Sequence, residues 1–172
     1  PDDKIVLASS NYSSEFLVNR YESNGLLDIG FGQGGKTITL IENIALPYAY
    51  FNAAHIQPDG KILLLGNTVD NMGGLESVTV RYKSNGDLDS SFYLNGMAFF
   101  KIDAGLSSEV SNSLASQGNM IIVGGVASPN SSIIAIRFLE KSNLFEPDVI
   151  AAGPLSICSG DSVNLSTTET GN

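Results

Sequence analysis

The residues whose spacing most closely fits a known chemistry lie between Gly30 and Thr37, which read G-F-G-Q-G-G-K-T. This order satisfies the pattern G-x-x-x-x-G-K-[ST], in which backbone amides and the lysine hold a phosphate. Such a loop needs a helix that begins at its lysine, because the helix N-terminus supplies the amides and the dipole. The next residues, K-T-I-T-L-I, are rich in β-branched types, so we predict a strand over Lys36–Ile41. We therefore interpret Gly30–Gly35 as a connection between strands and expect no nucleotide binding.

Histidine and cysteine chemistry is limited because His55 is the only histidine and Cys158 the only cysteine. A metal site built from several histidines is excluded, as are a zinc site of cysteines and a disulfide within the chain. A serine nucleophile would depend on His55 alone for activation. We interpret His55 as a polar position on a strand, aligned with Ser113 in the repeat described below.

Carboxylate pairs are the remaining candidates for catalysis, because glycosidases and some lyases use two facing acids. Asp2 and Asp3 are adjacent, and Asp87 and Asp89 are close together, but both pairs lie in segments that favour turns. Calcium is conceivable in the loops Asn85–Asp89 and Asp70–Gly74, yet neither offers the six or more oxygen ligands that the ion takes. We therefore assign no catalytic, cofactor-binding or metal-binding residue.

The composition excludes several classes of protein. The chain has 172 residues, a net charge of −9 and 42% hydrophobic residues, so it can bury a core and is not disordered as a whole. No apolar run approaches the roughly 20 residues of a membrane-spanning helix. Phosphate contacts need clustered lysine and arginine, so the acidic balance argues against nucleic acid as a partner.

The chain repeats itself with a period near 58 residues. Asp59–Gly66 reads D-G-K-I-L-L-L-G and aligns with both Gln117–Gly124 and Asp2–Ser9. A second block, Arg20–Gly35, aligns with Arg81–Gly96, and nine of these sixteen positions are identical. We delimit the copies as about 2–58, 59–116 and 117–146, so the third is incomplete.

Each copy reads as short strands separated by clusters of Gly, Asn, Asp and Ser. No segment has a sustained helical period. Each copy has about four predicted strands, the number found in one blade of a β-propeller. We therefore predict an all-β partial β-propeller of about two and a half four-stranded antiparallel blades. The predicted strands are Lys4–Ser9, Glu15–Tyr21, Lys36–Ile41, Tyr48–Ile56, Lys61–Gly66, Ser77–Tyr82, Met97–Ile102, Val110–Ala115, Met120–Gly124 and Ser132–Phe138.

The second block contains residues typical of tight turns. Asn24-Gly25 and Asn85-Gly86 favour a type I′ hairpin, in which both central residues have positive φ. Asp28 and Asp89 are expected to accept backbone N–H groups in the next turn and to pair with Arg20 and Arg81. We expect Phe31 and Phe92 to be buried under these loops, joined by Leu27 and Leu88.

The pattern D-G-K-I-L-hydrophobic-G, followed by R-Y-x-x-N-G-x-L-D-x-x-F-x-x-x-G, resembles the bacterial delta-60 repeat. The resemblance covers about residues 2–138. It implies a β-propeller of a secreted protein and carries no general activity or catalytic residue. The third copy departs from the pattern after Phe138, where L-E-K-S-N-L-F-E follows, so we expect the array to end there.

The remaining residues read as a linker over 147–153 and the start of another domain over 154–172. Pro154–Leu165 has the pattern P-x-x-x-C-x-G-D-S-V-x-L and resembles the opening of immunoglobulin-like or PKD-like modules of secreted Bacteroidota proteins, which implies the first strands of a β-sandwich. In such modules a cysteine near the first strand pairs with one near the domain's end. Cys158 is thus a disulfide candidate, with a buried free thiol as the alternative, and Asp161-Ser162-Val163 resembles an O-glycosylation pattern that would modify Ser162.

These observations favour a non-enzymatic scaffold or binding module, secreted or at the cell surface, that binds a protein or glycan. The alternative is a fragment of a propeller-type carbohydrate-active hydrolase or lyase whose catalytic carboxylates lie in blades outside this chain. The loops that differ between copies, Ser10–Ser14, Asp70–Glu76 and Ser128–Ser131, are the candidate binding surface. We also expect further repeats before Pro1 and the rest of the sandwich after Asn172.

Overall fold

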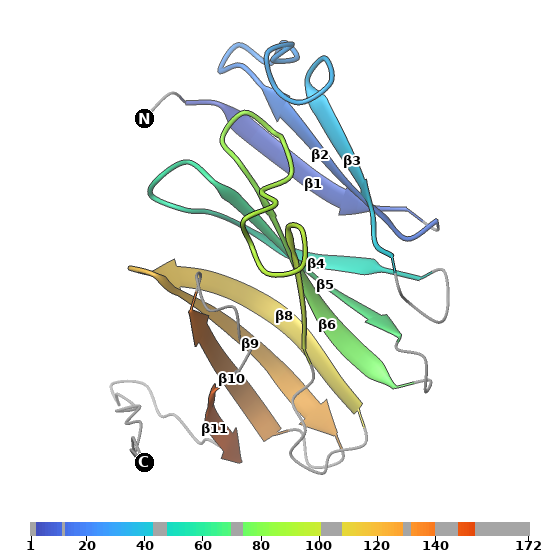
Figure 1. Cartoon of the computed structure of the whole chain (residues 1–172), viewed down its shortest axis with the longest axis vertical. Helices are drawn as coiled ribbons and strands as arrows, with labels where there is room; N and C mark the ends of the chain where they lie inside the picture. The colour runs from blue at the N-terminus through green and yellow to red at the C-terminus, as the bar shows by residue number, and fades with distance from the viewer. Residues whose placement is uncertain are drawn as a thin grey trace.

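A computed structural model describes residues 3–11, 13–42, 48–69, 74–100, 108–128, 132–139 and 148–153. Within these ranges the chain is all-β and forms three antiparallel sheets, stacked one after another along the molecule (Figure 1). The first sheet contains β1 (Ile5–Ser10), β2 (Glu15–Tyr21) and β3 (Lys36–Leu40). The second contains β4 (Tyr50–Ile56), β5 (Ile62–Val69), β6 (Leu75–Tyr82) and β7 (Met97–Phe100). The third contains β8 (Ser108–Gln117), β9 (Met120–Ser128), β10 (Ser132–Leu139) and β11 (Asp148–Gly153).

The ten strands predicted from the sequence are all present, with ends that differ by a few residues. Neighbours along the chain pair with each other in every sheet, and the three sheets do not close into a ring. The predicted end of the seventh strand, residues 101–102, lies outside the described residues.

The core lies in two layers, one on each face of the second sheet. Side chains alternate between the faces of a strand, so β5 places Ile62 and Leu64 toward the first sheet and Leu63 and Leu65 toward the third. The layer between the first and second sheets also contains Phe16, Val18, Phe31, Val78, Val80 and Tyr82. The layer between the second and third contains Phe92, Ala98, Phe100, Ile121, Val123 and Ile136.

The third sheet corrects the expected end of the array. Part of the segment 147–153, expected as a linker, is the strand β11, which pairs antiparallel with β10 from Ile133↔Gly153 to Arg137↔Asp148. The third sheet therefore has four strands, as the second does. The repeat of the fold continues although its sequence motif is lost.

The turns at Asn24-Gly25 and Asn85-Gly86 are not type I′, because only the glycine of each pair has positive φ. Gly25 N donates to Glu22 O at 2.8 Å and Glu22 N donates to Leu26 O at 2.8 Å, and the second copy repeats these bonds. This pattern fits a three-residue loop that ends in a left-handed glycine. The asparagine side chain accepts the N–H two residues on, from Leu26 and from Asp87.

The expected burial of the repeated aromatic residue is confirmed, because Phe31 and Phe92 are both fully buried. Leu88 is partly buried, but Leu27 remains 41% exposed, so the expectation for Leu27 was wrong. Both leucines instead cover a glycine, Gly35 or Gly96. A Cβ on either glycine would lie within 2.5 Å of the leucine side chain.

Candidate functional site

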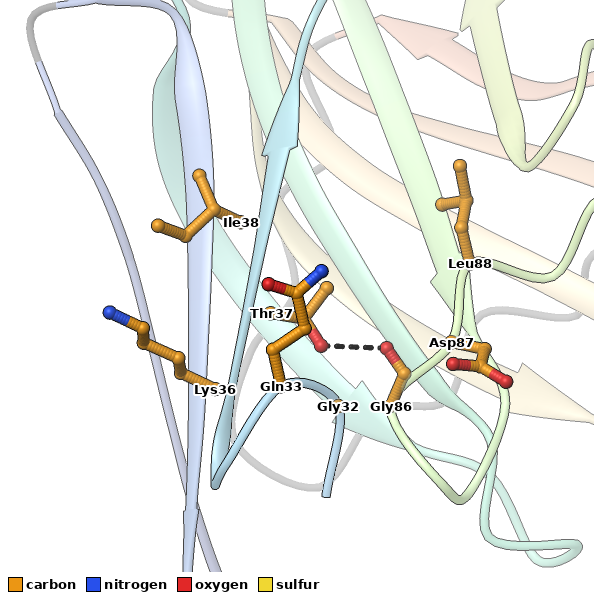
Figure 2. Close-up of a pocket in the computed structure, with 8 residues that line it drawn as sticks. All are labelled: Gly32, Gln33, Lys36, Thr37, Ile38, Gly86, Asp87 and Leu88. Carbon is orange, nitrogen blue, oxygen red and sulfur yellow. Dashed lines mark hydrogen bonds between the residues drawn. The ribbon is translucent and has the colours of Figure 1, made fainter. Parts of the chain in front are cut away.

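The glycine-rich loop lies between the first two sheets, beside a hollow of about 280 Å³ (Figure 2). The segment from Lys36 is the strand β3, which confirms the prediction and leaves the loop without the helix that a phosphate site requires. Thr37 Oγ1 donates to Gly86 O at 2.7 Å, and Lys36 points away from Asp87 (Figure 2). The glycine-rich loop and the start of β3 therefore pack against the Asn85-Gly86 turn of the next copy. The hollow is lined by Gly32, Gln33, Lys36, Thr37, Ile38, Gly86, Asp87 and Leu88.

In the first sheet the repeated arginine, aspartate and phenylalanine form one cluster. Arg20 Nε donates to Asp28 Oδ2 at 2.6 Å, and the Arg20 guanidinium lies 4.5 Å from the centre of the Phe31 ring. Lys4 Nζ reaches the same Asp28 oxygen at 2.8 Å. Asp28 Oδ1 accepts the Gly30 N–H at 3.1 Å, so the carboxylate also supports the loop that follows it.

The second sheet repeats the cluster with different neighbours. Arg81 Nε donates to Asp89 Oδ2 at 2.9 Å, and the guanidinium lies 4.5 Å from the centre of the Phe92 ring. Asp89 Oδ1 accepts hydrogen bonds from the Ser91 hydroxyl at 2.6 Å and the Ser91 N–H at 3.3 Å. The predicted arginine–aspartate pairs and turn bonds are thus confirmed in both copies.

These contacts hold both aspartates in the ionised form. Hydrogen bonds from Lys4 and then Arg20 lower the pKa of Asp28 to about 2. Burial by itself raises the pKa of Asp89, but the Ser91 hydroxyl and the charge of Arg81 outweigh it, so the pKa is lowered overall. A general acid must carry a proton near neutral pH. Neither carboxylate is suited to that role.

A buried polar cluster that sequence reasoning missed joins the second and third sheets. Ser77 Oγ lies 2.6 Å from Ser111 Oγ, and Asn67 Nδ2 donates to Ser111 O at 3.2 Å. Asn52 Nδ2 donates to the same carbonyl at 2.6 Å. A β-bulge between Ser111 and Ser113 places these groups, and nothing in the amino-acid order marks it. The cluster ties the second and third sheets together.

The single histidine lies on β4, and its side chain contacts β8. His55 Nε2 is 2.8 Å from Ser116 Oγ. His55 pairs with Leu63 in the second sheet, and Ser116 pairs with Ile121 in the third. Ile121 is the residue that aligns with Leu63 in the repeat. Ser116 is thus the counterpart of His55, which corrects the expected alignment with Ser113. The polar strand position expected for His55 is confirmed.

A larger hollow, of about 560 Å³, lies between the first two sheets at the side of β1. Lys4, Val6 and Arg20 line it from the first sheet, and Ile56, Ile62 and the turn 57–60 from the second. Val6 of the first sheet, and Ile56 and Ile62 of the second, therefore give this space apolar lining from both sheets. Ser84 completes the lining.

The other residues selected from the sequence are only partly placed. Cys158, Ser162 and residues 70–73 lie outside the described residues, as does the expected β-sandwich. In the Asn85–Asp89 loop, Asn85 Nδ2 donates to Asp87 Oδ2 at 2.8 Å, so these side chains bind each other. Among the residues that the structure describes, no three His, Cys, Asp or Glu side chains gather as metal ligands would.

Within the same part of the chain, no helix has the length and apolar character needed to cross a membrane. Residues 57–92 match the family model "Domain of unknown function (DUF5122) beta-propeller". No curated protein and no solved structure matches the chain. The matched segment runs from the turn before β5 to Phe92 and contains the whole Arg81, Asp89 and Phe92 cluster. The match and the three repeated antiparallel sheets together support a β-propeller repeat protein.

Proposed function

We propose that this chain is part of a secreted or cell-surface β-propeller that acts as a non-enzymatic binding scaffold for a protein or glycan. The main support for the proposal is a difference between the connections at the two ends of the sheets. Connections at one end repeat between the first two copies, and connections at the other end differ between all three. A rigid framework with variable loops on one side is a common arrangement for binding.

The repeated end serves the framework. The β2–β3 and β6–β7 connections contain the clusters around Asp28 and Asp89. Their arginines, aspartates and phenylalanines contact one another, and the turn of the second copy packs on the loop of the first. The repeated arginine, aspartate and phenylalanine side chains at this end thus serve the packing of the sheets.

The variable end follows β1, β5 and β9. These equivalent strands point toward the same side of the molecule, at the right and lower edges of Figure 1. The connections there are Ser10–Ser14, Asp70–Glu76 and Ser128–Ser131, which differ in sequence and are rich in Ser, Asn and Gly. Such residues offer adaptable hydrogen bonding to a ligand, which supports a protein or glycan partner.

The proposal is tested with the intact protein on an array of defined glycans and purified proteins. Three variants each replace one variable connection, at residues 11–13, 70–73 or 129–131, with Gly and Ser. We expect at least one replacement to reduce binding by tenfold or more. The matched control is Gln33→Ser at the repeated end, which should bind as the parent does. Binding that survives all three replacements would contradict the proposal, as would hydrolysis or cleavage of an array glycan.

A further inference from the structure

Two tyrosines at the start of β4 form an exposed aromatic pair. Tyr48 and Tyr50 are 42% and 55% exposed. Their ring centres lie 6.3 Å apart, and the ring planes differ by only 12°. The residues that alternate with them, Ala49 and Phe51, pack in the core layer between the first and second sheets. Because alternate side chains of an extended segment point to opposite faces, the two rings face away from that layer and toward solvent.

The backbone under the pair is held from two sides. Thr68 Oγ1 donates to Tyr48 O at 3.1 Å, and Phe51 N donates to Ser10 Oγ at 2.9 Å. The Phe51 ring also packs edge-on against Phe16. A surface whose backbone is already fixed loses little conformational freedom when a ligand covers it. The tyrosine pair is therefore preorganised for binding.

The pair lies at the end of the sheets where the connections differ. Tyr50 pairs with Asn67, two residues before the end of β5, and Phe51 contacts Ser10, the last residue of β1. The strand β4 thus begins beside the ends of β1 and β5 (Figure 1). Asn67 aligns with Gly125, whose partner on β8 is Ser111. A serine therefore corresponds to Tyr50 in the third sheet, and the pair is not part of the repeated framework.

The orientation of the rings favours a flat, uncharged ligand. The electron-rich face of an aromatic ring attracts weakly positive C–H groups. A cage for an ammonium ion surrounds the cation with several rings, whereas these two rings are nearly parallel. Nucleic-acid bases also stack on tyrosine, but the net charge of −9 disfavours their phosphates. A neutral sugar ring fits, because its C–H groups form an apolar face and its hydroxyls lie at the rim.

We propose that Tyr48 and Tyr50 form the stacking surface of a glycan-binding site that takes neutral pyranose units. The tyrosine hydroxyls and the amide of Asn52 supply polar partners for the sugar hydroxyls. Asn52 is exposed, and its Nδ2 is bound to Ser111 O at 2.6 Å, so that the orientation of its amide is fixed. This inference rests on the proposed binding function, to which it adds the ligand class and the contact residues.

Substitutions at the two rings test the proposal in the intact protein. The probes are an array of neutral glucan, xylan, mannan and galactan oligosaccharides, together with the purified proteins of the binding test above. Tyr48→Ala and Tyr50→Ala each remove one ring, and Tyr50→Phe keeps the ring without its hydroxyl. The matched control is Leu26→Ala, because Leu26 is 67% exposed and lies at the repeated end. Affinity for the strongest binder is measured by titration calorimetry, and the melting temperature checks folding.

We expect a neutral oligosaccharide to bind and each alanine variant to lose about tenfold or more in affinity. Tyr50→Phe should stay within about threefold of the parent, because stacking needs only the ring, and Leu26→Ala should bind as the parent does. The chain has no tryptophan, so tyrosine dominates its fluorescence. The sugar should change this emission in the parent and change it less in Tyr50→Ala.

Full affinity in both alanine variants would overturn the proposal, as would an equal loss in Tyr50→Phe and Tyr50→Ala. In either case the proposed binding function stands if replacement of a variable connection still weakens the same binding. An array on which only a protein binds would overturn the glycan assignment and leave the binding function in place. An array on which nothing binds would contradict both.

Discussion

Arg20 and Arg81 each bind an aspartate with one edge of the guanidinium and cover a buried phenylalanine with its face. Guanidinium groups favour this combination because they are planar, weakly hydrated cations that stack on rings. The two copies differ in depth: the Arg81 and Asp89 side chains are 5% and 4% exposed, whereas that of Arg20 is 16% exposed. The same three residue types therefore pack together in both sheets, and the arginine is more deeply buried in the second.

Truncation of the repeated phenylalanine should strongly destabilise the fold. Phe92 is fully buried between the second and third sheets, so Phe92→Ala leaves a cavity and removes the surface under Arg81. We expect a loss of about 3–5 kcal/mol in the free energy of unfolding, measured by urea denaturation. Ile29→Ala is the control, because Ile29 is 80% exposed and should change stability little. Equal effects of the two substitutions would contradict the role assigned to Phe92.

The lowered pKa of Asp28 predicts that the folded chain loses stability in acid. Its pKa is lowered to about 2 in the folded chain from an ordinary value of 3.8. The unfolded chain therefore takes up a proton first, and the contribution of Asp28, complete above about pH 5, is lost as the pH falls toward 2. The melting temperature of Asp28→Asn should fall less than that of the parent between pH 5 and pH 2. Parallel curves for the two proteins would show that Asp28 does not contribute in this way.

Residue contacts could be predicted from sequence only where both partners belong to one motif. Arg20 and Asp28 are eight positions apart in a repeated block, and the pairing follows from that block. Lys4 binds Asp28 from 24 positions away, and this contact depends on the register of β1 against β2. The cluster around Ser111 likewise depends on a bulge and on the approach of another sheet. Neither arrangement leaves a local signal.

At the scale of elements, the Asn-Gly turn of the second copy acts as the connector between two sheets. The carbonyls of Ser84, Asn85 and Gly86 accept hydrogen bonds from the first copy, whose donors are Arg20 Nη1, the Gly32 N–H and the Thr37 hydroxyl. Gly86 also lies against the Phe31 ring, where a Cβ would come within 2.9 Å of a ring carbon. Lys36 and Thr37, which match the end of the phosphate-loop pattern, thus begin the strand β3. Thr37 binds the Asn-Gly turn of the second copy.

Alanine substitutions at two equivalent glycines distinguish the energetic cost of turn strain from the cost of disturbed packing between sheets. Gly25 and Gly86 have φ values of 82° and 91°, so alanine at either position is strained. A Cβ at Gly25 meets nothing within 4 Å, whereas one at Gly86 would lie 2.7 Å from Gly32 N. Gly25→Ala should cost about 1–2 kcal/mol in unfolding free energy, and Gly86→Ala roughly 1–3 kcal/mol more. Urea denaturation measures both, and equal losses would show that the turn does not pack between the sheets.

Strand positions could be predicted because β-branched and aromatic runs are separated by turn residues in every copy. The strand β11 was missed because its sequence, D-V-I-A-A-G, lies between Pro147 and Pro154 and ends in glycine, so that it resembles a linker. Its place in the sheet comes from pairing with β10, a contact that composition does not reveal. The Asn-Gly turns were placed correctly, but their type differs because each loop has three residues and only the last, the glycine, has positive φ.

At the scale of the whole molecule, the outer face of the first sheet carries the apolar residues Ile5, Leu7, Ile38 and Leu40, which are 48–58% exposed. In the second sheet, the residues equivalent to Ile5 and Leu7 are Ile62 and Leu64, which are 1% and 0% exposed because the first sheet covers them. Exposed apolar patches of this kind are associated with interfaces. The face therefore has the composition of one that packs against another sheet.

The 172 residues expressed alone should consequently associate through this face. Replacing Leu7 and Ile38 together with glutamate should shift the sedimentation profile toward the monomer and raise solubility. The matched control replaces Ile29 and Leu94 together with glutamate, because both are also exposed but lie in connections outside this face. A parent chain that sediments as a monodisperse monomer and melts cooperatively would contradict the expectation that the sheets belong to a larger array.

Successive sheets stack with β4 and β8 side by side, as in adjacent blades of a propeller. His55 reports on this directly, because it is the only histidine and its ring signals in a proton NMR spectrum are unique. Its Nε2 lies 2.8 Å from Ser116 Oγ across the two sheets. We expect nuclear Overhauser contacts between the His55 ring protons and the β-protons of Ser116. Contacts from His55 only to residues of its own sheet would contradict the stacking and, with it, the propeller arrangement.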